Sequence, residues 1–201
     1  MTQPRSTLFS RSDTPYYHCV SRCVRHAFLC GEDFTRGKSY EHRRKWLEQK
    51  LLNTADSFAI KVCAYSVMSN HYHVVLKVCS EEADEWPVNE VISRWHSLYS
   101  GTVFSRRFMA GEALSASEDH ELNQSIALWR ERLTNISWFM KTVNHAVAVM
   151  ANEEDECKGH FWESRFKCQA LLDDRALLSS MACVLCSSVK DLAARVIVYN
   201  H

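Results

Sequence analysis

The segment "MSNHYHVVLKV", residues 68–78, decides how this sequence is read, because a polar turn leads there into a run of β-branched and apolar residues. Such a run after Ser and Asn predicts a strand that starts at residue 71. Side chains alternate between the two faces of a strand, so His71 and His73 share one face and Tyr72 takes the other. Two adjacent imidazoles are either part of a metal site or two polar residues at a strand end.

Alternating and helical patterns along the rest of the chain predict an α+β fold. The expected strands span 16–22, 58–68, 71–78 and the first half of 159–172, and the expected helices span 39–57, 89–101, 121–153 with a break near Asn135, and 173–200. The core order β-α-β-β-α-β is that of the split βαβ, ferredoxin-like sandwich. We therefore expect an antiparallel sheet with helices on one face, a helical insertion and a C-terminal helix. Strands 16–22 and 71–78 should be its central neighbours.

The length of 201 residues and the hydrophobic content of 46% suit one domain with a substantial core. We expect a single domain over 1–201 with a loose N-terminus at 1–14 and an insertion at about 81–134, irregular over 101–122. Asp173 or Asp174 should cap the C-terminal helix, since a carboxylate accepts hydrogen bonds from the first amides of a helix.

Bulk charge does not point to a particular partner, because Lys+Arg and Asp+Glu both total 24. The distribution is less even: the first 50 residues lean basic, whereas 81–90, "EEADEWPVNE", is acidic. This asymmetry fits a protein with one anion-binding face, and it fits an ordinary solvated surface equally.

The cysteines point to a reducing compartment. There are nine of them, scattered and odd in number, which argues against a disulfide framework. The start of the chain has no apolar signal-peptide segment, and no stretch approaches the roughly 20 apolar residues of a membrane span. We expect a cytosolic protein with inert thiols. The alternative is structural zinc at Cys19 and Cys23 or at Cys183 and Cys186, but neither pair has a partner pair at finger-like spacing.

Four extended blocks, in this order, carry a family resemblance: "TPYYHCVSRCVRHAFLCGED", "CAYSVMSNHYHVVL", "WRERLTNISWFMKTVN" and "GHFWESRFKCQALLDDRALL". Together they resemble the REP-associated tyrosine transposases, of the insertion-sequence-200-like group of HUH single-strand DNA transposases. The resemblance runs from about Thr14 to Ser180. It implies a ferredoxin-like domain, monomeric or homodimeric, that binds hairpin and single-stranded DNA and cuts one strand. It also implies a bacterial, cytoplasmic, nucleoid-associated protein with no membrane partner.

The resemblance gives the two histidines a role. His71 and His73 fall on the family's histidine–hydrophobic–histidine motif and would hold a divalent cation, Mg or Mn, that polarises the scissile phosphate. In the family, a tyrosine hydroxyl then attacks the phosphorus, forms a 5′-phosphotyrosine and releases a 3′-OH.

The block that should carry this tyrosine departs from the family. The family block resembles "MAYVDLNPIRAG", and the matching run here is "MACVLCSSVKDL" from Met181. Cys183 takes the place of the tyrosine, and Ser187 takes the place of the Asn expected to complete the metal shell. A thiol with an ordinary pKa of about 8.5 is mostly protonated at neutral pH. Tyr199 lies 16 residues further on, about 24 Å along a continuous helix.

Two interpretations follow from this substitution. The first is a transposase-family protein that binds DNA and, where a nucleophile assembles, cleaves and rejoins one strand. The second is a catalytically dead DNA-binding remnant, degenerated or truncated at its C-terminal end. A metal-free ferredoxin-like RNA binder is disfavoured, since no aromatic-rich RNA-recognition motif occurs.

Basic residues near the ends of the first and last strands are the predicted DNA contacts, because cations bind phosphates and neighbouring aromatics stack on unpaired bases. These residues are Arg22, Arg25, Arg165 and Lys167, with Trp162 and Phe166 beside the last two. For Arg43, Arg44 and Lys45, a solvated helix face is an equally good interpretation.

Overall fold

The computed structural model describes residues 14–24 and 27–190, except for the side chains of residues 183 and 185–190. Its main sheet has four antiparallel strands in the order β4-β5-β1-β6. These strands are β1 (Tyr16–Arg22), β4 (Ile60–Val67), β5 (His71–Val78) and β6 (Lys167–Ala170). This is the strand order of the ferredoxin-like sandwich, with β1 and β5 in the centre. The predicted fold class is therefore confirmed, and the bounds of both central strands match the prediction.

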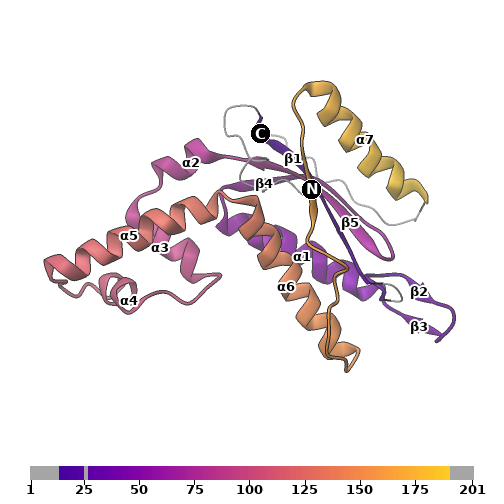
Figure 1. The fold of residues 1–201 in the computed structure, drawn as a ribbon, viewed down its shortest axis with the longest axis horizontal. Helices are drawn as coiled ribbons and strands as arrows, with labels where there is room; N and C mark the ends of the chain where they lie inside the picture. Colours follow the sequence, from indigo (N-terminus) through magenta and orange to yellow (C-terminus); the bar gives the residue numbers. More distant parts are fainter. Residues whose placement is uncertain (1–13, 25–26, 191–201) are drawn as a thin grey trace.

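Two helices cover one face of the sheet (Figure 1), namely α1 (His42–Ser57) and α6 (Ile136–Glu154). Side chains of β5 that point to this face, such as Tyr72, Val74 and Leu76, are fully buried. The predicted break near Asn135 is also observed: its side chain caps α6 by accepting hydrogen bonds from two backbone amides of the first turn. The apolar alternation of β5 thus fixes which face carries the core.

Arg43 ties α1 to the end of α6 from a fully buried position. Its guanidinium donates to Glu154 at 2.6 Å, to Asp155 at 2.5 Å and to the carbonyl of Phe28 at 2.9 Å. A buried guanidinium needs such partners, because an unpaired charge is costly out of water. Arg43 therefore belongs to neither a solvated face nor a DNA-contacting one.

The last described helix, α7 (Asp174–Lys190), lies on the opposite face of the sheet (Figure 1). Val184 packs there against Ala64 and Val75, in an apolar cluster separate from the main core. The Asp173 carboxylate accepts a hydrogen bond of 2.7 Å from the amide of Ala176. Asp173 is thus the N-terminal cap, one of the two predicted candidates.

Four further helices lie between β5 and α6, to one side of the sheet (Figure 1). They are α2 (Ser80–Glu85), α3 (Val88–His96), α4 (Val103–Met109) and α5 (Ala116–Leu133). The prediction of an irregular segment over 101–122 was wrong, because α4 and the start of α5 occupy it. Both helices begin at a capping side chain, Thr102 for α4 and the Ser115–Glu118 capping box for α5.

The backbone of Ala59 holds both ends of this helical insertion. Its carbonyl accepts from the amide of Cys79 at 2.9 Å, just after β5, and its amide donates to the carbonyl of Leu133 at 2.9 Å, the last residue of α5. Both ends of the insertion therefore meet at Ala59, the residue before β4.

Two smaller differences from prediction concern short strands. β6 lies in the second half of the 159–172 segment rather than the first, and Trp162 joins the sheet by a single bridge to Cys23. A two-stranded hairpin of β2 (Glu32–Asp33) and β3 (Lys38–Ser39) was not predicted. Within the described ranges, no helix combines the length and the apolar character needed to cross a membrane.

Candidate metal site

Three histidines from the two central strands lie together on the sheet face that carries α7. His71 and His73 share this face, as predicted, with ring centroids 5.2 Å apart. His18 of β1 stacks on His73 with centroids 5.0 Å apart, and its Nε2 lies 2.8 Å from Nδ1 of His73. The sequence analysis missed His18, although the predicted pairing of the two central strands could have brought it to this face.

The hydrogen bonds of these rings decide which nitrogens carry lone pairs. The side-chain oxygen of Asn70 lies 2.6 Å from Nδ1 of His71, so that nitrogen donates its proton and Nε2 carries the lone pair. His73 and His18 share one proton between facing nitrogens. When Nδ1 of His73 donates to His18, the lone pair of His73 also lies on Nε2. Outer partners commonly fix the tautomer of metal-binding histidines in this way.

Burial favours the neutral form of two of these imidazoles, those of His18 and His73. Desolvation, then the charges of His18, His71 and Arg22, lower the pKa of His73 to about 4, and burial lowers the pKa of His18 as well. Imidazole binds a metal ion only in its neutral form, so His73 is in the ligand state at neutral pH.

Imidazole nitrogens are ligands that divalent cations accept in proteins. Among residues 14–24 and 27–190, no group of three or more His, Cys, Asp or Glu side chains could enclose a metal ion. A cation at this place would therefore take two imidazoles from the described part of the chain and its remaining ligands from substrate or water oxygens. Ser66, directly opposite His73 on β4, is fully buried, and its hydroxyl has no hydrogen-bond partner in the described part of the chain. One polar atom on this face is thus left for a ligand or water.

The other predicted site residues fall in different places. Arg22 stands directly opposite His71 on the same face and is exposed, and Lys167 of β6 is exposed on that face two strands from β5. Arg165 is exposed in the segment before β6. Residue 183 lies within α7, but its side chain is outside the described part. Arg25 and Tyr199 also lie outside the described residues.

Two of the described cysteines are buried or half-buried thiols with raised pKa values. Burial raises the pKa of Cys23 to about 12 and also raises that of Cys63, so both stay protonated. Cys19 lies with its sulfur 3.3 Å from that of Cys168, its partner on β6. No zinc cluster forms among the described side chains.

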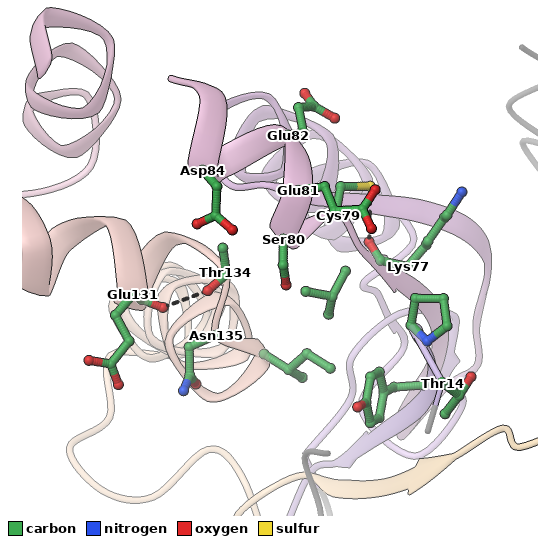
Figure 2. Close-up of a pocket in the computed structure, with 14 residues that line it drawn as sticks. Thr14, Lys77, Cys79, Ser80, Glu81, Glu82, Asp84, Glu131, Thr134 and Asn135 are labelled. Carbon is green, nitrogen blue, oxygen red and sulfur yellow. Dashed lines mark hydrogen bonds between the residues drawn. The ribbon is translucent and has the colours of Figure 1, made fainter. Parts of the chain in front are cut away.

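A cavity of about 880 Å³ lies at the far end of β5, beside the start of α2 and the end of α5. Figure 2 shows its polar rim, in which carboxylates outnumber the single ammonium group of Lys77. The acidic residues are Glu81, Glu82, Asp84 and Glu131. Their charge would repel a phosphate, so this cavity is not a nucleic-acid site.

Comparisons with known proteins add one structural similarity. No family model and no curated protein sequence matches the chain. A solved structure of a REP-associated tyrosine transposase bound to a REP hairpin is similar at 12% identity with a TM-score of 0.44, over 94% of this chain and 74% of that one. In its four sequence blocks the chain resembles the REP-associated tyrosine transposases, and the solved structure to which it is similar is one of them.

Proposed function

We propose that this protein is a transposase-like DNA-binding protein that takes hairpin DNA with single-stranded flanks and holds Mg or Mn at His71 and His73. The observation that carries the proposal is the pair of imidazoles of His71 and His73, side by side on one strand face, with Arg22 directly opposite His71. Their position on the family's motif supports the choice of DNA as the ligand. This support comes from the histidine side chains of this chain and not from the similarity of its backbone to a solved structure.

Each residue of the site has a distinct part in the proposal. A cation bound at the two histidines would neutralise charge on a phosphate and orient it. Arg22 contacts a phosphate next to the cation, and Lys167 adds a second positive charge on the same face. His18 holds the ring of His73 in place, while Asn70 holds that of His71.

Strand cleavage by the family's route requires a hydroxyl nucleophile, and residue 183 supplies a thiol instead. A thiol attacks only as thiolate, and an ordinary thiol with a pKa of about 8.5 is mostly protonated at neutral pH. We therefore propose that the chain forms the DNA complex without the covalent adduct. The proposal thus favours the DNA-binding remnant over the active nickase.

Electrophoretic gel shifts test the DNA-binding part. Labelled hairpin with flanks, a duplex of the same sequence and an unstructured strand are compared at two salt concentrations. The expected result is tightest binding to the hairpin, with an affinity that falls steeply as salt rises because phosphate contacts release counterions. Arg22→Ala should weaken binding, whereas Lys61→Ala, on the edge strand β4, is the matched control. Equal binding to all three DNAs would refute the proposal.

A further inference from the structure

We infer that Cys19 and Cys168 form a redox-modification site, at which hydrogen peroxide converts two thiols into a reversible disulfide that fastens β6 to β1. The two residues are direct register partners on these antiparallel strands, and their sulfur atoms lie 3.3 Å apart. Both side chains pack against the main core, on the sheet face away from the three histidines. The inference is therefore independent of DNA and metal binding.

The paired positions meet the steric requirements of a disulfide. Directly opposed residues of antiparallel strands have Cα atoms about 4.5 to 5.5 Å apart. Disulfides bridge Cα atoms that are roughly 4.4 to 6.8 Å apart. The two sulfurs need to approach by about 1.2 Å to reach the bonded distance of about 2.05 Å, a shift that side-chain rotation can supply without separating the strands. By contrast, Cys30 and Cys157 make hydrogen bonds to oxygen atoms, the Met68 carbonyl at 3.2 Å and the Asn152 side chain at 3.5 Å.

The two thiols differ in exposure, and the difference sets the order of their reactions. Cys19 is fully buried, whereas Cys168 is half-buried on β6, the edge strand of the sheet. A small oxidant from solvent therefore reaches Cys168 first, because reactivity towards peroxide follows exposure. Cys19 lies directly behind it and can attack the oxidised sulfur before a second oxidant molecule arrives.

Hydrogen peroxide as the oxidant balances the reaction. The thiolate of Cys168 attacks one peroxide oxygen and the O–O bond breaks, which leaves a sulfenic acid and releases one water after protonation. The thiolate of Cys19 then attacks the sulfenic sulfur, so that the S–S bond forms and the S–O bond breaks with loss of a second water. Together the two thiols lose two electrons and two protons. A dithiol reductant reverses the step by thiol–disulfide exchange, in keeping with the transient disulfides of reducing compartments.

The disulfide fastens a short edge strand. β6 (Lys167–Ala170) pairs with β1 at four register positions, and Cys168 is its second residue. The bond joins residues 149 positions apart in sequence, so it removes a large amount of conformational freedom from the unfolded chain. It also fixes the neighbouring Lys167 and the strand that leads into α7.

Mass spectrometry of the full chain tests the site. The reduced protein is treated with hydrogen peroxide, its remaining thiols are alkylated under denaturing conditions, and it is digested with trypsin without reductant. Cleavage after Arg and Lys places Cys19 in peptide 12–22 and Cys168 in peptide 168–175, each as the single cysteine. We expect these two peptides to be linked, with two fewer alkylated thiols than the nine of the sequence, and dithiothreitol to release them. Oxidation that links another pair, or that leaves these peptides unlinked, would overturn the inference.

Thermal unfolding measures the consequence. The oxidised wild type should melt about 10 °C above the reduced protein, because the link constrains the unfolded chain. Cys168→Ser should melt at one temperature with or without peroxide, whereas Cys63→Ser/Cys79→Ser, a control that removes two half-buried thiols, should keep the shift. Equal melting of oxidised and reduced wild type, or a shift that survives Cys168→Ser, would contradict the inference. If Cys168→Ser does not fold, the linked peptides of the wild type and the control variant decide the matter.

Discussion

Nε2 of His18 lies 2.8 Å from Nδ1 of His73, so an imidazole of β1 positions a predicted metal ligand of β5. Replacing His18 with Phe keeps an aromatic ring but removes the hydrogen-bond partner. We expect this change to weaken Mn binding by about tenfold, the lower end of what loss of a ligand's outer partner costs. Isothermal titration measures the effect. His18→Gln, which can still accept a hydrogen bond, should lose less, and equal losses in both variants would contradict a positioning role.

Removal of both predicted ligands should abolish metal binding. The wild-type chain should bind Mn or Mg weakly, since the proposed site has two imidazole ligands from the protein. The His71→Ala/His73→Ala variant should show no heat of binding in the same titration. If the variant and the wild type bind alike, the histidine pair is not the site.

The neutral state of His73 predicts a pH dependence of stability in metal-free protein. Its pKa is about 4 in the folded chain and 6.5 when unperturbed. Between these values the unfolded chain takes up a proton that the folded chain refuses, so stability falls as pH drops from 6.5 towards 4. Denaturant unfolding in EDTA should show this slope, and His73→Gln should flatten it. An identical slope in the variant would assign the effect to other groups.

Arg43 should matter more for stability than any exposed ion pair. Arg43→Ala leaves Glu154 and Asp155 without their buried partner, and we expect a loss of about 3 kcal/mol in the free energy of unfolding. Lys61→Ala, which breaks a 3.5 Å pair with Glu82 at the surface, should cost less than about 1 kcal/mol. Urea denaturation of both variants compares them directly, and similar losses would mean that Arg43 contributes no more than a surface charge.

The thiol at residue 183 predicts no covalent DNA adduct for the unmodified chain. Cys183→Tyr should restore a small amount, and Cys183→Tyr with Ser187→Asn should restore more, because nucleophile and metal ligand act as one unit. The assay is a denaturing gel with end-labelled hairpin DNA and Mn. Robust adduct from the unmodified chain, lost on Tyr199→Phe, would show that Tyr199 reaches the site.

Local patterns sufficed for the central strands and the histidine pair, because the alternation from His71 to Val78 fixes both the strand and its two faces. His18 was missed because its role depends on the register between strands far apart in sequence. The helices α4 and α5 were missed over 101–122, although the Ser115–Glu118 capping box was there to find. The alternating side chains around Trp162 predicted a strand, but the structure has only a single bridge from Trp162 to Cys23 there. A strand forms only where the backbone pairs with a neighbour, and the side-chain pattern does not report that pairing. The roles of Cys183 and Ser187 are inferred from the sequence alone, because their side chains lie outside the described part of the structure.

The shared attachment of the helical insertion at Ala59 has a consequence for protein engineering. Since Cys79, just before α2, and Leu133, the last residue of α5, both bond to the backbone of Ala59, a short linker can close the gap once the helices between are removed. Closing a short loop costs little more entropy than the present chain already loses there. The same junction is therefore a natural point at which to graft another small domain, whose ends lie close together, without shifting the register of β4 and β5.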